Sequence, residues 1–284
     1  MKIKQGKATI IGVGLIGGSL ASALKQAGWV VHGFDPNEAA LQYAVTQGII
    51  DRGFSGMDSS LCEADLVCYA TPPAVIPKLI QDCNAYFKPG CLVTDVASIK
   101  LDLVKHIEEV VPDTVHYVGG HPMAGSEKSG VWVSSAQLFV GAPYILTPTE
   151  RTDPTALSIL TQLVMELGAK PVILSPADHD YSVAVISHLP HVVAAALSKL
   201  GKKVNGNENR VASLAAGGFR DTTRIATANP HLWRDICLGN RERIKELLQL
   251  FREIVEEFEQ ALDAGADNDL VQYFTEAKQF RELF

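Results

Sequence analysis

The first 175 residues alternate between short apolar runs and segments with helical spacing, and this alternation constrains the fold more than any other feature of the sequence. Short apolar strands separated by helices are typical of a mostly parallel sheet that helices cover on both faces. We therefore predict an α/β domain over residues 1–175. Its strands are expected at residues 8–12, 30–34, 66–70, 92–95, 116–118, 143–146 and 171–174. Its helices are expected at residues 17–27, 38–47, 74–82, 99–109 and 154–167.

The sequence changes in character at Ser175. Residues 175–178, Ser-Pro-Ala-Asp, have the features of a helix start, with serine at the cap, proline in the first turn and an acid three residues after the cap. Over residues 236–262, apolar side chains recur every three or four positions, as in an amphipathic helix. We predict an all-α domain over residues 176–284 that pairs with a second copy. The alternative is that the apolar stripe packs only within its own domain.

A glycine-rich turn, Gly-Val-Gly-Leu-Ile-Gly at residues 12–17, lies between the first predicted strand and the first predicted helix. In a Rossmann-type domain the glycines allow a tight turn, close approach of a pyrophosphate and close helix packing. The helix N–H groups then bind the phosphates. Asp35 ends the next predicted strand, where a carboxylate binds the ribose hydroxyls of NAD and repels the 2′-phosphate of NADP. A turn that binds nothing is the alternative. The predicted NAD-binding residues are Gly12, Gly14, Leu15, Ile16, Gly17, Asp35, Thr71, Pro72 and Ser98.

His121 is the strongest candidate for a catalytic base. It precedes a proline, which favours extended backbone, and it follows an apolar strand. Ligands of open parallel sheets bind beyond the carboxyl ends of the strands, so we expect His121 to face a cleft beside the glycine turn. Ser98 is expected at the same edge, where its hydroxyl would bridge the nicotinamide and the imidazole, which suits proton transfer near neutral pH. The alternatives are a loop histidine bonded to backbone and a serine that caps a helix.

Two polar runs interrupt the second domain. Within Ser-His-Leu-Pro-His at residues 187–191, His188 and His191 share one helix face. A metal site there would lack further ligands, and core histidines are the alternative. Arg224 offers a planar fork for a carboxylate, with Asp221 placed to support it. The alternative is an ordinary intramolecular ion pair.

Composition narrows the classes of partner. A net charge of −7 without a basic aromatic-rich patch argues against nucleic acid, and 47% hydrophobic with 20% charged residues is typical of a soluble globular protein. The 5 cysteines include no CxxC pair, which favours reduced thiols and a cytoplasmic location. Residues 1–7 leave no room for a signal peptide, and residues 183–197 are expected to be too short and too polar to cross a membrane.

Taken together, six motifs resemble the prephenate/arogenate dehydrogenase family of tyrosine biosynthesis over nearly the whole chain. The resemblance implies an N-terminal nucleotide-binding domain and a helical domain through which two chains dimerise. It also implies NAD-dependent oxidative decarboxylation of prephenate, arogenate or both, without a metal. The motifs are GVGLIGGSL at 12–20, DVASIK at 95–100, GGHPMAGSEKSG at 119–130, SHLPH at 187–191, GFRDTTRIA at 218–226 and NPHLWRDI at 229–236.

The resemblance also implies roles for individual residues. His121 would accept the proton of the ring hydroxyl, and Ser98 would orient that hydroxyl and the nicotinamide. Arg224 would bind a substrate carboxylate with support from Asp221, and Glu127 would belong to a polar network near the entrance. The residues that shape the substrate pocket would be Ser187, His188, His191 and Trp233.

Three other functions stay open at this point. The first is a dehydrogenase strictly specific for arogenate, although the pair Glu127-Lys128 favours prephenate. The end of the chain near Phe284 predicts that tyrosine, if it inhibits, competes with the substrate at the active site. A β-hydroxyacid-type dehydrogenase would need a catalytic lysine in the second domain, where the lysines sit at a predicted helix end. An NAD-sensing binding module would leave His121 and Arg224 without a role.

Overall fold

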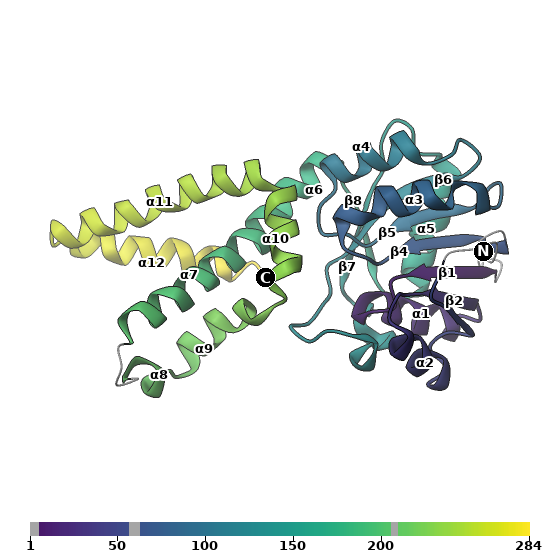
Figure 1. Ribbon diagram of the computed structural model, residues 1–284. Helices are drawn as coiled ribbons and strands as arrows, with labels where there is room; N and C mark the ends of the chain where they lie inside the picture. Colours follow the sequence, from purple (N-terminus) through teal and green to yellow (C-terminus); the bar gives the residue numbers. More distant parts are fainter. Residues whose placement is uncertain (1–5, 57–62, 206–209) are drawn as a thin grey trace.

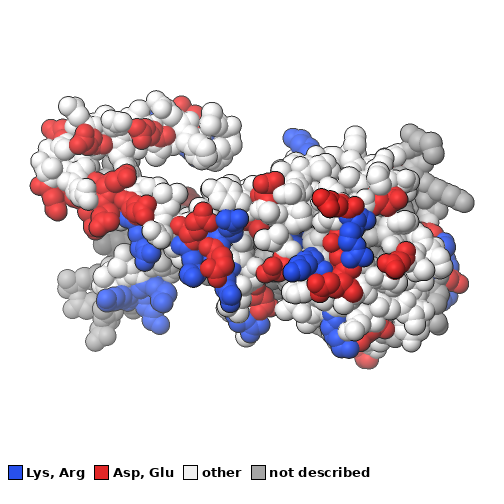
Figure 2. All heavy atoms as spheres, turned by 90° about the horizontal axis from the view of Figure 1, so that it is seen from above, with Lys and Arg blue, Asp and Glu red and all other residues white. Residues whose placement is uncertain are grey.

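The computed structural model describes residues 6–56, 63–205 and 210–284, with backbone only for Arg210. A sheet domain and a helical domain lie side by side, and the long helices of the second extend away from the sheet (Figure 1). On the face in Figure 2, acidic and basic side chains are interspersed over the sheet domain.

The sheet has eight strands in the order β3-β2-β1-β4-β5-β6-β7-β8. Neighbouring strands run parallel except β6 and β7, which are antiparallel, so the predicted mostly parallel sheet is confirmed. Strand β3 was not predicted, because three residues centred on a glycine carry no periodic signal. The strands are β1 (Lys7–Ile11), β2 (Val30–Phe34), β3 (Arg52–Phe54), β4 (Leu66–Tyr69), β5 (Leu92–Asp95), β6 (His116–Pro122), β7 (Pro143–Thr147) and β8 (Lys170–Ile173).

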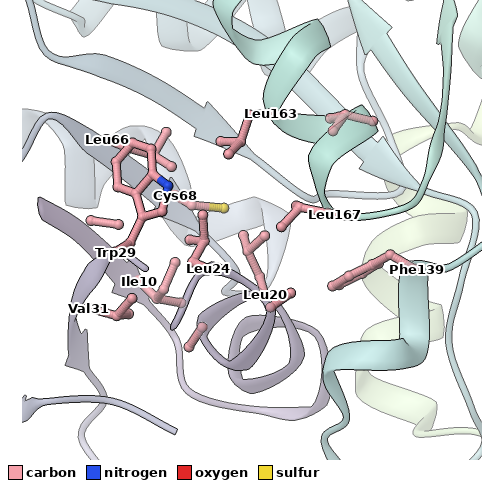
Figure 3. Packing of buried hydrophobic residues seen from close by; sticks show 14 of the residues in the cluster. Ile10, Leu20, Leu24, Trp29, Val31, Leu66, Cys68, Phe139, Leu163 and Leu167 are labelled. Atoms are coloured by element: carbon pink, nitrogen blue, oxygen red, sulfur yellow. The ribbon is translucent and has the colours of Figure 1, made fainter. Parts of the chain in front are cut away.

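Both faces of the sheet are buried. Successive residues of a strand point to opposite faces, so Ile10 and Ile11 belong to different apolar clusters. Figure 3 shows the first cluster, where Ile10, Leu24 and Leu66 meet Leu163. The second lies under α3 and α4 and includes Ile80. The covering helices are α1 (Leu15–Gln26), α2 (Glu38–Thr46), α3 (Ile76–Cys83), α4 (Leu101–Val110) and α5 (Pro154–Glu166).

The first helix after the sheet begins at Pro176, and Ser175 caps it by accepting a hydrogen bond from the Asp178 N–H. The continuous helix predicted over residues 236–262 is not observed, because the chain turns at Asn240 and divides it into α10 and α11. A side chain at Gly239 would lie 2.2 Å from Ile99, so this turn packs closely against the sheet domain. The helices are α6 (Pro176–Val183), α7 (Leu189–Val204), α8 (Arg210–Leu214), α9 (Gly217–Thr223), α10 (Pro230–Gly239), α11 (Arg241–Asp263) and α12 (Asp267–Arg281).

A π-helical turn, Ala184–His188, joins α6 to α7 and makes one helical run over residues 176–204. The turn ends two residues before Pro190, which has no N–H to donate to the preceding turn. The run is longer than the 183–197 stretch, which was expected to be too short and too polar to cross a membrane, so that expectation does not hold for the whole run. The run has 29 residues, and its most apolar 18-residue window has a mean hydropathy of 1.5, so it could cross a membrane by length and composition, a test that core helices of soluble proteins also pass.

Candidate active site

The glycine turn has the geometry of a phosphate-binding loop. Gly12 has a φ of +98°, which only glycine adopts readily, and a side chain there would lie 2.5 Å from the Ala70 carbonyl oxygen. At Gly17 it would lie 1.9 Å from the Gly12 carbonyl oxygen, whereas at Gly14 it would meet nothing within 4 Å. No side chain caps α1, which begins at Leu15, so its N–H groups are available to a phosphate. This loop can hold a pyrophosphate over Gly14.

The two residues beside this turn also fit a dinucleotide. The Asp35 carboxylate accepts hydrogen bonds from the N–H groups of Val13 (2.8 Å) and Asn37 (2.9 Å), which fixes it against the turn. No lysine or arginine occurs among the three residues that follow Asp35, so these positions offer no counter-charge to a 2′-phosphate. The Thr71 hydroxyl is buried without a partner, and its methyl group lies against Gly12. Asp35 and the orphaned Thr71 hydroxyl therefore fit NAD, and the exposed Pro72 follows them at the same rim.

His121 is the penultimate residue of β6 and is 8% exposed. The two glycines before it let β6 pack tightly, since a side chain at Gly119 would lie 2.4 Å from the Thr147 hydroxyl. At Gly120 it would lie 2.7 Å from the Asp95 carbonyl oxygen. The strand end thus holds the imidazole against the junction of the two domains.

A chain of hydrogen bonds connects this imidazole to the helical domain. His121 Nδ1 lies 2.8 Å from His179 Nε2, and His179 Nδ1 lies 2.7 Å from Asp180 Oδ1. Asp180 also accepts the N–H groups of Lys100 (2.7 Å) and Leu101 (2.9 Å) at the start of α4. A carboxylate only accepts, so His179 donates from Nδ1 and accepts the Nδ1–H of His121 at Nε2. This assignment leaves Nε2 as the basic nitrogen of His121.

A buried ion pair lies behind the imidazole. Lys100 Nζ is 2.8 Å from Asp95 Oδ1, both side chains are fully buried, and the Tyr117 hydroxyl donates to Asp95 Oδ2 at 2.7 Å. Burial, and after it the positive charge of Lys100, holds the pKa of His121 well below its ordinary value. Burial also lowers the pKa of His179, against the hydrogen bond to Asp180, which raises it. His121 is therefore neutral near pH 7 and able to accept a proton.

Three rings gather on the helical-domain side of the junction. The His191 and Trp233 rings are stacked with centroids 3.4 Å apart, and the edge of His188 meets Trp233 at 6.1 Å. Burial lowers the pKa of His188 to about 4, against the negative charge of Asp180 and the backbone of Ser98, which raise it. Ser187, next to His188, is half-buried. This group brings four predicted pocket residues together.

Arg224 joins the two domains at the surface. Its guanidinium lies 3.4 Å from the Glu127 carboxylate, on the loop after β6, and both side chains are substantially exposed. In the described residues no ion pair joins Arg224 to Asp221, which lies on α9. The predicted support of the arginine by Asp221 is therefore absent from this arrangement, and Glu127 takes that place.

Sequence reasoning missed four buried polar residues of the site. His179 and Asp180 directly follow the helix start at residues 175–178 and were not considered, although an adjacent His-Asp pair at the start of a long helical run was a usable signal. Lys100 was counted as part of a motif, and Asn240 was hidden inside the helix predicted over 236–262. Within the described residues, no group of three or more His, Cys, Asp or Glu side chains could hold a metal ion.

Comparisons with known proteins agree with this architecture. The family model described as "Prephenate dehydrogenase, nucleotide-binding domain" matches residues 20–174, and "Prephenate dehydrogenase, dimerization domain" matches residues 175–276. The prephenate dehydrogenase of Bacillus subtilis is 37% identical over 99% of this chain and 77% of its own length.

Two solved structures are similar over nearly the full length. Prephenate dehydrogenase from Aquifex aeolicus, in complex with hydroxyphenyl propionate and NAD+, has a TM-score of 0.93 at 33% identity, covering 99% of both chains. Synechocystis arogenate dehydrogenase has a TM-score of 0.83 at 33% identity, covering 97% of this chain and 99% of that one. Both family models, the identity and the shared fold lead to one conclusion: the chain belongs to the prephenate dehydrogenase family.

Proposed function

We propose that this protein catalyses the oxidative decarboxylation of prephenate, with hydride transfer to NAD, in tyrosine biosynthesis. The observation that carries the proposal is the buried chain from Asp180 through His179 to His121, which leaves a neutral imidazole with a basic Nε2. The relatives from Bacillus subtilis and Aquifex aeolicus are named prephenate dehydrogenases, and the latter binds NAD+ and a hydroxylated ring with a carboxylate tail.

The chemistry requires one proton acceptor and no metal. Bound NAD+ supplies the acceptor for a hydride from the ring carbon that carries the hydroxyl. His121 Nε2 takes the hydroxyl proton as this carbon becomes a carbonyl carbon. The bond to the ring carboxylate breaks, its electron pair completes the aromatic ring, and carbon dioxide leaves. The proton then returns from His121 to the phenolic oxygen, so atoms and charge balance.

The neighbours of His121 support this role. A proton on Nε2 makes the imidazole a cation, and the negative charge of Asp180, transmitted through His179, stabilises that cation. Ser98 is assigned to orient the hydroxyl and the nicotinamide. Arg224 is assigned to a substrate carboxylate, which would replace the exposed Glu127 carboxylate as its partner.

The substrate pocket is assigned to the residues around Trp233, namely Ser187, His188 and His191. The side chain of the substrate distinguishes prephenate, a keto acid, from arogenate, an amino acid. The pair Glu127-Lys128 supports prephenate as the substrate of this chain. The alternative is that this chain acts only on arogenate, which the similarity to Synechocystis arogenate dehydrogenase supports.

We also propose that two copies pair through the helical domain, with the domain division between residues 175 and 176. Large apolar side chains are exposed there, among them Ile186, Leu250 and Phe274, and the matching family model is described as a dimerization domain. The apolar helical run over 176–204 would be covered by the second copy and not by lipid, because it carries His179 and Asp180. A cytoplasmic location is supported by the free thiols of Cys68, Cys91 and Cys237, while Cys62 lies outside the described residues.

The decisive experiment measures NADH formation with prephenate and with arogenate, each with NAD and NADP. We expect turnover with prephenate and NAD, and a much lower kcat/KM with NADP. Turnover with arogenate alone would establish the strict arogenate specificity instead. NAD binding without turnover of either substrate would overturn the proposed activity in favour of an NAD-binding module.

A further inference from the structure

Asn240 lies at the break between α10 and α11, and its side chain is almost fully buried. Its amide nitrogen lies 2.7 Å from the backbone carbonyl oxygen of Asp180 and 3.2 Å from Nδ1 of His188. One side chain therefore contacts both α6 and the last residue of the π-helical turn. The proposed chemistry does not itself use this side chain.

These two contacts determine which nitrogen of His188 carries its proton. A carbonyl oxygen only accepts hydrogen bonds, so the Asn240 atom next to Asp180 must be the NH₂ group. The second N–H of that group points to His188 Nδ1, which must then accept. In the neutral ring the proton therefore sits on Nε2.

The donor on Nε2 has no partner of its own. His188 is 1% exposed, and its Nε2 atom is buried without a hydrogen bond. The Ser98 backbone lies close enough to raise the pKa of His188, but it leaves Nε2 without a well-formed hydrogen bond. A buried donor left unpaired is costly, and the cost disappears when a ligand brings an acceptor. The position between Ser98 and Trp233 is the place assigned to the substrate.

We infer that Asn240 is a positioning residue that holds His188 as a neutral Nε2–H donor to an oxygen atom of the bound substrate. The identity of the ligand rests on the proposed function, whereas the protonation state of the ring does not. Neutrality matters here, because a positive charge on His188 would oppose protonation of nearby His121 during the reaction. A neutral donor binds the substrate oxygen without that penalty.

Nitrogen NMR of histidine-labelled full-length protein tests the protonation state directly, with His188→Gln used to identify the His188 signals. We expect the unmodified protein to carry the proton on Nε2 of His188 at neutral pH. In Asn240→Asp the new carboxylate accepts from Nδ1, so the proton moves to that nitrogen. A proton on Nδ1 in the unmodified protein would overturn the inference without any variant.

Kinetics tests the consequence for the substrate. We expect Asn240→Leu to lower kcat/KM for prephenate about 10- to 100-fold, mainly through KM, with unchanged NAD binding. In a His188→Gln background, where an amide donates permanently, the same change should cost less than about threefold. An equal loss in both backgrounds, or no loss in either, would contradict action through His188.

Asn229→Ala is the matched control, because Asn229 caps the start of α10 through its Oδ1, at the other end of the same helix. It removes a capping amide and should leave the His188 signals unmoved. A shift of those signals in Asn229→Ala equal to that in Asn240→Asp would assign the effect to general loosening of α10. Should the protein lack prephenate turnover, the proposed function fails while the NMR result still decides the role of Asn240.

Discussion

The two domains differ in how completely they bury their apolar side chains. In the sheet domain both faces carry apolar clusters, with Trp29 and Phe139 among their largest members. In the helical domain the buried residues include four polar ones, all in the network at the junction, while many large apolar side chains are exposed. The sheet domain thus has a complete core of its own, whereas the helical domain is completed by neighbours: the sheet domain at one end and, we propose, a second copy along its helices. The buried polar residues are His179, Asp180, His188 and Asn240.

The largest effect should follow from breaking the buried network at its sheet-domain end. We expect His121→Asn to lower kcat by about 10²- to 10⁴-fold, because the ring hydroxyl loses its proton acceptor. NAD affinity, measured by fluorescence titration, should change little, since the glycine turn is untouched. A kcat within a few-fold of the unmodified protein would remove His121 from the mechanism.

Low pH should lower the stability of the folded protein in the absence of substrate, because it favours protonation of the same network. Burial holds the pKa of His188 at about 4 in the folded protein, below the ordinary 6.5. The unfolded chain therefore binds protons that the folded chain does not, and stability falls as the pH drops from about 6.5 towards 4. His188 alone contributes about 3 kcal/mol over that window. Urea unfolding at both ends of the window measures the loss, which His188→Gln should reduce, and equal stability at both ends would contradict it.

A change at the helical-domain end of the network should lower kcat by less than the loss of His121. Asp180→Asn keeps the shape of the side chain but removes the charge that stabilises a protonated His121. We expect kcat to fall about 10- to 100-fold. Asp178→Asn is the control, since Asp178 lies on the same helix, is exposed and contacts Ser175. Equal losses in both variants would point to damage to the helix and not to the network.

The smallest effect should come from the exposed apolar surface of the helical domain. Leu250 is half exposed on α11, and replacing it with lysine should weaken pairing of two copies by about 1 kcal/mol per chain. Analytical ultracentrifugation would detect the shift in the dimer dissociation constant. Gln249→Lys, at the neighbouring polar position, is the control. A single-chain mass for the unmodified protein would rule out the pairing altogether.

The fold could largely be predicted from the sequence because its signals are local. The apolar strand at residues 30–34 and the helix from Glu38 appear at the predicted places, since strand composition and a capping residue act within a few positions. The missed turn at Asn240 shows the limit: apolar spacing continues through the break, and only packing against Ile99 reveals it.

The site could be predicted only in part, because many of its contacts join residues that are far apart in the sequence. His121 and Asp35 stand at strand ends, where the sequence pattern itself indicates a ligand-binding edge. Their partners lie far away along the chain, as with His179, and a contact of this kind leaves no periodic trace. Arg224 was found by its motif, but its pairing with Glu127 depends on how the two domains meet.

The π-helical turn at Ala184–His188 has a geometric consequence for the whole catalytic centre. Each added residue rotates the remainder of a helix by about 100° around its axis, so the extra residue sets the angle between His179 and His191. Deleting one residue from the turn would restore an ordinary helix and swing one histidine away from the other. The angular offset that brings a proton relay and a stacked aromatic pocket to a common centre is thus encoded by a single inserted residue.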